Sequence, residues 1–450
     1  MNKIRTVSVF MFCAFLAQCA IAQNSATMMT YSLRQCVETA IASNLDVQQG
    51  NLVMQQRRID WNQARLNLLP SVFGSASMDF TKGRNIDQAT NTYINSKATY
   101  GNYGLSSDVV LFNGFYLQNS VKQNALSYEA SRMDWQQAKD NVTIAVILAY
   151  LQVLNNEDLL VQARNQADVS QKDIERLEVM NKEGAIQPSQ LTDLKGQFAN
   201  DQLSIISTQN SLVSAKIDLC RLMNIPYDKN MQLERINAEA YATKYDETPE
   251  SIFKVALDQF AQVKAADLRA QSAARAVKAA RGQLFPTLGL GANIGTTYAS
   301  TFTDPVTNQK ISYTTQLRNN RSEAVGLSLR IPIFNSLFSQ NRIKLAKLTQ
   351  KNNELIAKTT KTQLQQSIEL AHNNMTSSAD RYKVLLEQVA AYNESFRAAT
   401  IRFNNGLGTS VDYLTAKDNF DRANINLISA KYDYVLRTKI LDYYQGKQLW

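Results

Sequence analysis

Two runs of the chain, TLGLGANIGTTY at 287–298 and EAVGLSLRIPIF at 323–334, decide the fold. In each run apolar residues alternate with glycine or polar residues, which is the pattern of a β-strand with one apolar face. Two earlier runs, SVFGSASMDF at 71–80 and GLSSDVVLFN at 104–113, show the same alternation more weakly. Each run is close to the roughly ten residues that a tilted strand needs to cross an outer-membrane hydrocarbon layer. The four runs therefore predict two pairs of membrane-crossing strands.

Polar loops at 81–100 and 299–322 join the two members of each pair. The alternative is that the strands form two half-buried hairpins of a soluble domain. If the strands do cross a membrane, four are too few to close a barrel, and an open edge in lipid leaves backbone groups unpaired. Several chains must then share one barrel. Two chains would supply about eight strands and three about twelve, and only the wider barrel leaves an open lumen.

The segments between these runs predict long helices. They are rich in Ala, Leu, Gln and Lys, and the 7 prolines of the chain lie at junctions or loops. At 1.5 Å per residue the longest helices reach about 100 Å, so they must bury an apolar seam against neighbours. A coiled-coil scaffold would explain the helices alone. The predicted helices occupy residues 33–66, 114–181, 189–223, 250–283, 336–403 and 411–445.

An internal repeat organises the chain. LLPSV at 68–72 resembles LFPTL at 284–288, LFN at 111–113 resembles IFN at 333–335, and Gly184 corresponds to Gly406. Such self-similarity at a nearly constant offset indicates two homologous halves. We expect a first repeat at 23–223, a polar connector at 224–249 and a second repeat at 250–450.

Residues 1–22 have the features of an export signal. Lys3 and Arg5 precede an apolar stretch, and Ala20-Ile21-Ala22 fits a cleavage site. Lipidation at Cys19 is the competing interpretation. Removal of the signal leaves two cysteines, Cys36 and Cys220, which are too few for a disulfide framework and are expected to be buried thiols.

Several function classes gain no support from the sequence. The chain of 450 residues has a formal net charge of +9, but its basic residues are scattered rather than clustered as nucleic-acid binding requires. The longest apolar stretch after the signal, Val142–Leu154, is shorter than a membrane helix and is expected to be a buried helix segment. The single histidine, His372, is expected to be a solvated or lumen-facing polar residue rather than a metal ligand. No nucleophile motif, phosphate loop or Cys/His cluster is present, so we expect no enzyme activity, cofactor or metal.

The order of these elements resembles the TolC family of outer-membrane efflux ducts. The strongest match is Asn405-Gly406-Leu407-Gly408-Thr409-Ser410-Val411-Asp412, with Lys182–Ser189 as its counterpart in the first half and Asp442–Gly446 as a further match near the end. The resemblance implies a mixed α and β membrane protein that forms a homotrimer. It implies a 12-stranded β-barrel, with four strands from each chain, continued by a long periplasmic α-helical barrel.

The resemblance also implies where the functional residues lie. The two matched segments would form helical tips that dock onto a periplasmic adaptor, a membrane fusion protein, fed by an inner-membrane pump or transporter. Gly406 and Gly408 would form a tight turn, and an exposed apolar residue there, such as Leu407, needs a partner to bury it. The expected docking residues are Gly184, Ala185, Ile186, Gly406, Leu407, Gly408 and Thr409.

Three further positions match those of the family's periplasmic gate. Asp412 matches an acidic position that faces the lumen, although Ser410 as an N-cap would also place Asp412 in a favourable first helical turn. Gln190 stands at the corresponding acidic position of the other tip, so an aspartate ring would be thinner here. Phe403 stands where the family has a tyrosine whose hydrogen bond helps to hold the tips shut, and phenylalanine cannot make that bond.

The sequence therefore predicts an outer-membrane exit duct that passively conducts small molecules. Two alternatives remain open: the exit duct of a type I protein secretion system, and a periplasmic coiled-coil scaffold whose hairpins merely pack on it.

Overall fold

The computed structural model describes residues 30–87, 91–236, 247–447 and 449. The export signal expected at 1–22, with the choice between Cys19 and Ala22, lies outside the described residues, as does part of the expected connector. The chain forms two compact units. One comprises Met1–Gln48, Ala138–Asp258 and Gln365–Trp450, and the other comprises Gln49–Gln137 and Gln259–Leu364.

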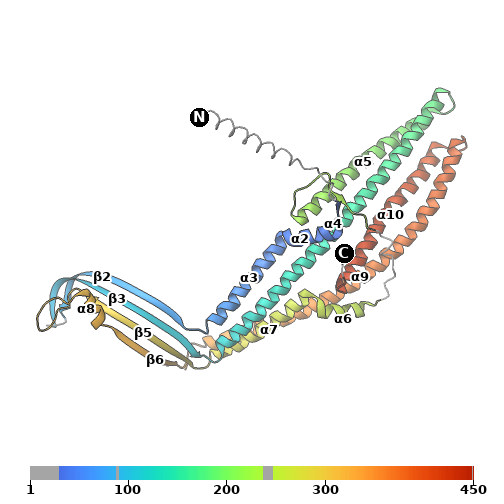
Figure 1. The fold of residues 1–450 in the computed structure, drawn as a ribbon. Coiled ribbons are helices and arrows are strands. Elements are labelled where there is room, and N and C mark those ends of the chain that lie inside the picture. Colours follow the sequence, from blue (N-terminus) through green and yellow to red (C-terminus); the bar gives the residue numbers. More distant parts are fainter. Residues whose placement is uncertain (1–29, 88–90, 237–246, 448, 450) are drawn as a thin grey trace, which may run out of the picture. The chain divides into compact units, whose positions relative to one another are not determined.

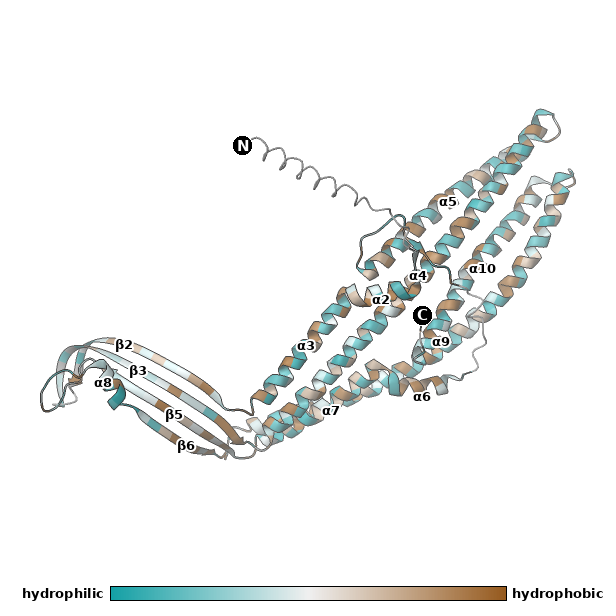
Figure 2. Ribbon diagram, viewed as in Figure 1, coloured by the Kyte–Doolittle hydropathy of each residue, from teal (hydrophilic) through white to brown (hydrophobic). Residues whose placement is uncertain are grey.

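The first unit contains two helical hairpins (Figure 1). In one hairpin α4 (Tyr116–Lys182) turns into α5 (Pro188–Met223), and in the other α9 (Phe338–Asn404) turns into α10 (Ser410–Tyr444). The N-terminal parts of α4 and α9 belong to the second unit. Hydrophilic and hydrophobic residues mix along all four helices (Figure 2), as expected where a helix buries only part of its surface.

Short elements complete this unit. They are α2 (Leu33–Ser43), α6 (Pro249–Gln259) and the parallel pair of two-residue strands β1 (Thr30–Tyr31) and β4 (Gln232–Leu233). The Tyr150 hydroxyl donates to the carbonyl oxygens of Tyr31 and Glu234, which fastens this pair to α4. The sequence analysis missed the strand pair because two residues carry no periodicity.

The predicted apolar segment Val142–Leu154 is buried in α4, with Val146, Tyr150 and Leu154 at most 1% exposed. Within the described chain, α4 is also the one helix long and apolar enough to cross a membrane by length and composition, but half of that window is buried inside the protein. Cys36 and Cys220 are buried free thiols, and burial raises the pKa of Cys36 to about 12.

The second unit carries a four-stranded antiparallel sheet in the order β2-β3-β5-β6. Its helices are α3 (Leu45–Leu66), α7 (Ala261–Gly282) and the short α8 (Tyr313–Asn319). Directly paired residues share a face of a sheet, and the pairing aligns Val72, Ser107, Ala292 and Val325 in one row. The predicted apolar positions of the four strands therefore lie on one face, which we call the apolar face, as far as the register shift between Val110 and Phe112. The strands are β2 (Ser71–Asp87), β3 (Thr92–Phe112), β5 (Thr287–Ala299) and β6 (Ser322–Arg330).

Two of the expected helices are each divided in the structure. The helix expected at 33–66 is divided at Asn44, whose backbone is extended and whose side chain accepts from Asp46 N and donates to the Leu222 carbonyl at 2.9 Å. Asparagine favours such local bonding over a helix interior. The helix expected at 250–283 is likewise divided at Phe260, which has extended backbone.

The strands also have different limits. The first pair is longer than 71–80 and 104–113, because the polar segments beyond residue 80 continue to pair with each other as far as Asp87 and Thr92. The strand expected at 323–334 ends at Arg330, since Pro332 cannot donate to the ladder.

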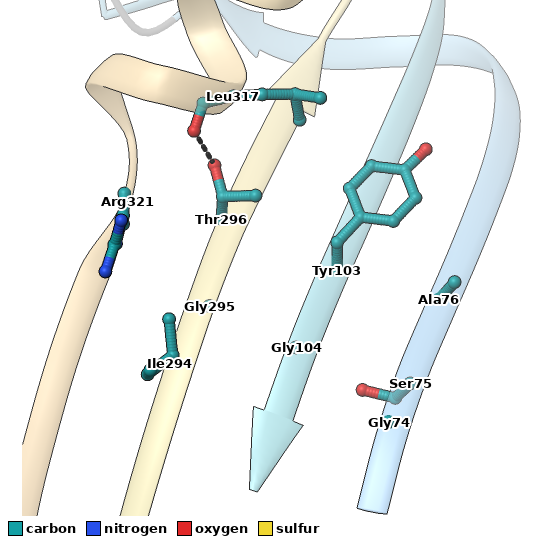
Figure 3. A pocket seen from close by; sticks show the side chains of 10 residues that line it. All are labelled: Gly74, Ser75, Ala76, Tyr103, Gly104, Ile294, Gly295, Thr296, Leu317 and Arg321. Carbon is teal, nitrogen blue, oxygen red and sulfur yellow. Dashed lines mark hydrogen bonds between the residues drawn. The ribbon is translucent and has the colours of Figure 1, made fainter.

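Helix α8 lies in the polar loop expected at 299–322, and it packs on the apolar face. Thr296 Oγ1 donates to the Leu317 carbonyl at 2.7 Å, and the Tyr313 hydroxyl donates to that of Tyr103 at 3.0 Å. A hollow of about 620 Å³ lies between α8 and the sheet (Figure 3). Its lining is made of Gly74, Ser75, Ala76, Tyr103, Gly104, Ile294, Gly295, Thr296, Leu317 and Arg321.

Gly114 at the junction of β3 and α4 is a sensitive position. Its φ is +65°, and a Cβ there would stand 2.3 Å from the Gly282 carbonyl oxygen. We expect Gly114→Ala to reduce the yield of folded protein severely, because the backbone conformation alone costs about 1–2 kcal/mol and the clash adds to it. Quantitative immunoblotting of the non-aggregated protein checks the yield. Gly74→Ala is the control, since nothing lies within 4 Å of its added Cβ, and equal loss in both variants would contradict the prediction.

Candidate functional site: the tips of the helical hairpins

Both tips end their first helix in the same way. Gly184 and Gly406 have φ of +68° and +72°, and the residue after each glycine donates its N–H five residues back, Ala185 to Met180 and Leu407 to Arg402, at 2.9 Å. This pattern is the Schellman motif, in which a left-handed residue satisfies the last carbonyls of a helix. Glycine is required at both positions because other residues are strained there.

The second helix of each hairpin starts differently. Pro188 opens α5, where its missing N–H costs nothing. Helix α10 starts with a capping box: Thr409 Oγ1 accepts from Asp412 N at 3.1 Å, and the Asp412 carboxylate accepts from Thr409 N at 3.3 Å. The N-cap is therefore Thr409 rather than Ser410, which is the first helical residue. The Asp412 carboxylate also accepts from the Thr409 hydroxyl at 2.7 Å, and this bond first, then the bond from Thr409 N, lowers the pKa of Asp412.

A small apolar core lies behind the tips. Helices α4, α5, α9 and α10 contribute the buried side chains Ile174, Leu177, Leu194, Phe403 and Tyr413. The Phe403 and Tyr413 rings stack with centroids 4.9 Å apart. Ile186, expected to face an adaptor, packs partly against this core, whereas Leu407 is 80% exposed.

A polar cluster next to this core joins the two hairpins. The Tyr413 hydroxyl on α10 donates to the Asp173 carboxylate on α4. Arg176, one turn along α4, forms an ion pair with Asp173 at 3.2 Å and donates to the Asn404 side chain at the end of α9. Burial and the bond to Asp173 raise the pKa of Tyr413, so its hydroxyl remains a donor at physiological pH. We call Asp173, Arg176, Asn404 and Tyr413 the latch.

A second link lies closer to the start of α10, where Ser410 Oγ donates to the Asp193 carboxylate of α5 at 2.9 Å. A third lies deeper. Lys417, 3% exposed, forms ion pairs with Asp421 at 2.8 Å and with Asp201 of α5 at 3.5 Å. Asp201 also accepts from Ser170 of α4 at 2.5 Å. Hairpin α9–α10 is thus tied to hairpin α4–α5 at three levels.

The structure brings most of the expected site residues together. A hollow of about 410 Å³ between the two tips is lined in part by Gly184, Ala185, Ile186, Gln190, Phe403, Gly406 and Gly408. Leu407, Thr409 and Asp412 do not line it and are exposed or near the surface. Sequence reasoning missed Asp173, Arg176 and Tyr413. The first two lie on α4 and the third on α10, and the periodicity of either helix does not reveal that these residues meet.

Across the described residues, no group of three or more His, Cys, Asp and Glu side chains could hold a metal ion. His372 lies within α9, partly exposed.

A sheet with one apolar face and two paired helical tips are features that the resemblance to outer-membrane ducts implies, and comparison with known proteins agrees. The outer membrane efflux protein family model matches residues 36–224 and again 253–443. The chain therefore belongs to the outer membrane efflux protein family, which confirms the TolC-family resemblance and an outer-membrane location.

Individual relatives are distant but cover most of the chain. The outer membrane protein TolC of Escherichia coli is 21% identical over 381 residues, which is 83% of this chain and 74% of that protein. The CusC structure matches with a TM-score of 0.81 and 17% identity over 92% of both chains. The outer membrane channel CmeC of Campylobacter jejuni matches with a TM-score of 0.80 and 18% identity over 92% of this chain and 85% of that one.

Proposed function

We propose that three copies of this chain form an outer-membrane exit duct, which passively conducts small molecules delivered by a periplasmic adaptor and an inner-membrane pump. The observation that carries the proposal is the open four-stranded sheet with one apolar face. Its edge strands β2 and β6 each pair on one side within the chain, and exposed strand edges inside lipid are costly. Copies of the chain satisfy both edges if β2 of one copy pairs with β6 of the next. Three copies then supply about twelve strands and an open lumen.

The helices support the same assembly. Large apolar side chains on α3 and α9 are exposed in the single chain, which is costly unless another subunit covers them. Packed against neighbouring copies, they would extend the barrel as a tunnel of helices. They include Leu52, Ile59, Leu345, Leu348, Leu355 and Leu370, each more than half exposed.

The two halves are proposed to be repeats of one unit, at 23–223 and 250–450, with an export signal at 1–22. The family model matches once in each half. The junction between the second strand and the long helix also has the same unusual backbone in both halves. Positive φ occurs at the consecutive residues Gly114 and Phe115, and again at Ser336 and Leu337. Two repeats in each of three chains would suit an adaptor ring of sixfold symmetry.

The tips are proposed to dock onto the adaptor. Leu407 offers the adaptor an apolar side chain that is 80% exposed in the single chain. The hollow between the tips, lined by the neighbouring Gly406 and Gly408, offers a recess for an adaptor side chain. Asp412, Gln190 and Phe403 are proposed to act at the periplasmic gate, with Asp412 facing the lumen. Of these, Phe403 acts through the latch: its ring stacks on Tyr413 and lies 5.8 Å from the Arg176 guanidinium. Adaptor contacts that favour separated tips would shift the gate towards opening.

Membrane fractionation and bilayer recording test the proposal together. We expect the wild-type protein to stay in the outer membrane after an alkaline wash, to migrate as a heat-sensitive trimer and to conduct ions. A periplasmic scaffold would instead wash off and conduct nothing. A protein-secretion duct would conduct equally but would fail to restore drug efflux in cells that lack their own duct.

A matched pair of variants tests the proposed subunit contact. We expect Leu345→Glu with Leu348→Glu to abolish the trimer band, because charges would replace apolar side chains in a buried interface. Val306→Glu, at a loop residue that is 90% exposed, is the control and should leave the trimer intact. A stable trimer of the double variant would contradict the proposed contact.

A further inference from the structure

Charged side chains are sorted by face in the β2–β3 hairpin. Lys82, Arg84 and Lys97 lie on the apolar face, because they alternate in step with Phe80 and with Thr99, its partner. Asp79 and Asp108 lie on the opposite face by the same rule. These five are all the charged residues of β2 and β3 whose side chains the structure describes.

The three basic residues are crowded. Lys82 and Lys97 are direct partners in the register, and Arg84 pairs with Asn95 in the next row of the same face. Like charges directly opposite each other in an antiparallel pair destabilise the sheet. The guanidinium of Arg84 lies 4.5 Å from the centre of the Tyr93 ring, and no ion pair found among the described residues includes any of the three. All three side chains are exposed. Among the side chains of β2 and β3 that the structure describes, these three close cations have no acidic neighbour on their face.

Their height on the sheet places them at a membrane surface, if the proposed function holds. From Val72 to Phe80 the apolar positions of β2 rise about 27 Å along the strand. At a tilt of about 40° this is about 21 Å, close to the roughly 25 Å apolar band of an outer-membrane barrel. Lys82 is the next residue after Phe80 on the same face of β2, and Lys97 is its direct partner on β3. The aromatic residues Tyr103, Tyr298 and Tyr313 pack together on the same face, as in an interfacial girdle.

We infer that Lys82, Arg84 and Lys97 bind the phosphate groups of anionic lipids in the outer leaflet. Basic side chains next to an apolar membrane-spanning surface attract anionic headgroups, and a phosphate between Lys82 and Lys97 would relieve their repulsion. The hollow under α8, on the same face, offers mostly small and apolar lining to an acyl chain (Figure 3). At its edge Arg321 pairs with Glu323, so that pair adds no net charge. The inference rests on the proposed function, which sets the orientation of the sheet.

Lipid retention by the purified full-length protein tests the inference. Wild-type protein in nanodiscs is titrated with bisphosphorylated lipid A or with phosphatidylcholine, and bound lipid is counted by native mass spectrometry. We expect selective retention of lipid A, which Lys82→Gln with Arg84→Gln and Lys97→Gln weakens by at least about tenfold. High salt should weaken it too, because these charges are exposed.

The matched control is Arg330→Gln, which removes a base from the other face at the other end of the sheet. It should retain lipid A as the wild type does. Equal retention by the triple variant, equal retention of phosphatidylcholine, or displacement by millimolar inorganic phosphate would overturn the inference. Conductance is measured on the same preparations: a wild type that does not conduct counts against the proposed function, whereas a triple variant that conducts normally but loses lipid A supports the inference alone.

Discussion

Tyr413→Phe is expected to increase the open-channel conductance and to make cells leakier to large antibiotics. The substitution keeps the ring that stacks on Phe403 but removes the hydroxyl that donates to Asp173. Loss of one partner from a buried hydrogen bond to a charged group costs about 1–3 kcal/mol. If the latch holds the hairpins together in the closed state, this cost shifts the balance towards separated tips by about five- to 150-fold. Single-channel recording and a vancomycin sensitivity assay measure the two effects.

The chain offers a closely matched control for this experiment. Tyr432, also on α10 and buried, donates its hydroxyl to Asp158 of α4 at 2.8 Å. Tyr432→Phe removes the same kind of bond far along the helix from the tips. It should lower stability to a similar extent and leave conductance unchanged. If both variants conduct as the wild type does, the latch has no part in the gate.

Lys417→Met is expected to destabilise the hairpin contact by about 3–5 kcal/mol, because it leaves Asp201 and Asp421 buried without their cation. Burial already raises the pKa of Asp421, against the opposing effect of Lys417. Removing the cation should raise it further, so the aspartate would take up a proton more readily as the pH falls. A carboxyl with a raised folded-state pKa favours folding at low pH and loses that contribution as the pH rises. The loss of stability of Lys417→Met relative to the wild type should therefore be smaller at pH 5 than at pH 8, as measured by thermal unfolding.

Arg422→Met serves as the control for Lys417→Met. Arg422 lies on the same helix and pairs with Asp418, but both side chains are about half exposed or more. Such a surface pair contributes about 0–1 kcal/mol, so the control should unfold nearly as the wild type does. Equal effects of the two substitutions would contradict the claim that the buried ion pairs of Lys417 stabilise the protein more than an exposed pair does.

The long helices and the strands could be predicted from the sequence because each has its own period. Alternation from Val72 to Phe80 and from Leu288 to Tyr298 marks strands wherever one face must be apolar. The same logic missed the outer part of the β2–β3 hairpin, since Lys82 and Lys97 continue the ladder without any apolar alternation. It also missed the break at Asn44, because one extended residue hardly disturbs the periodicity on either side.

The tips show a different limit of sequence reasoning. The turn glycines Gly184 and Gly406 could be found because a left-handed residue favours one residue type. The latch could not, because the Tyr413 to Asp173 contact depends on how four helices pack, and a lone tyrosine in a helix has no distinguishing pattern. Phe403 was noted for the hydrogen bond it cannot make, yet its ring stacks on the tyrosine that makes one.

The two Schellman turns have the same backbone conformation but present different side chains at the surface. Ile186 turns partly inward onto the core behind the tips, while Leu407 remains in solvent. In a threefold assembly the two kinds of turn would alternate around the periplasmic end of the duct. An adaptor made of identical subunits would then meet two chemically distinct binding sites. Every second adaptor subunit would then gain a leucine to bury, and its neighbours would have to bind by other means.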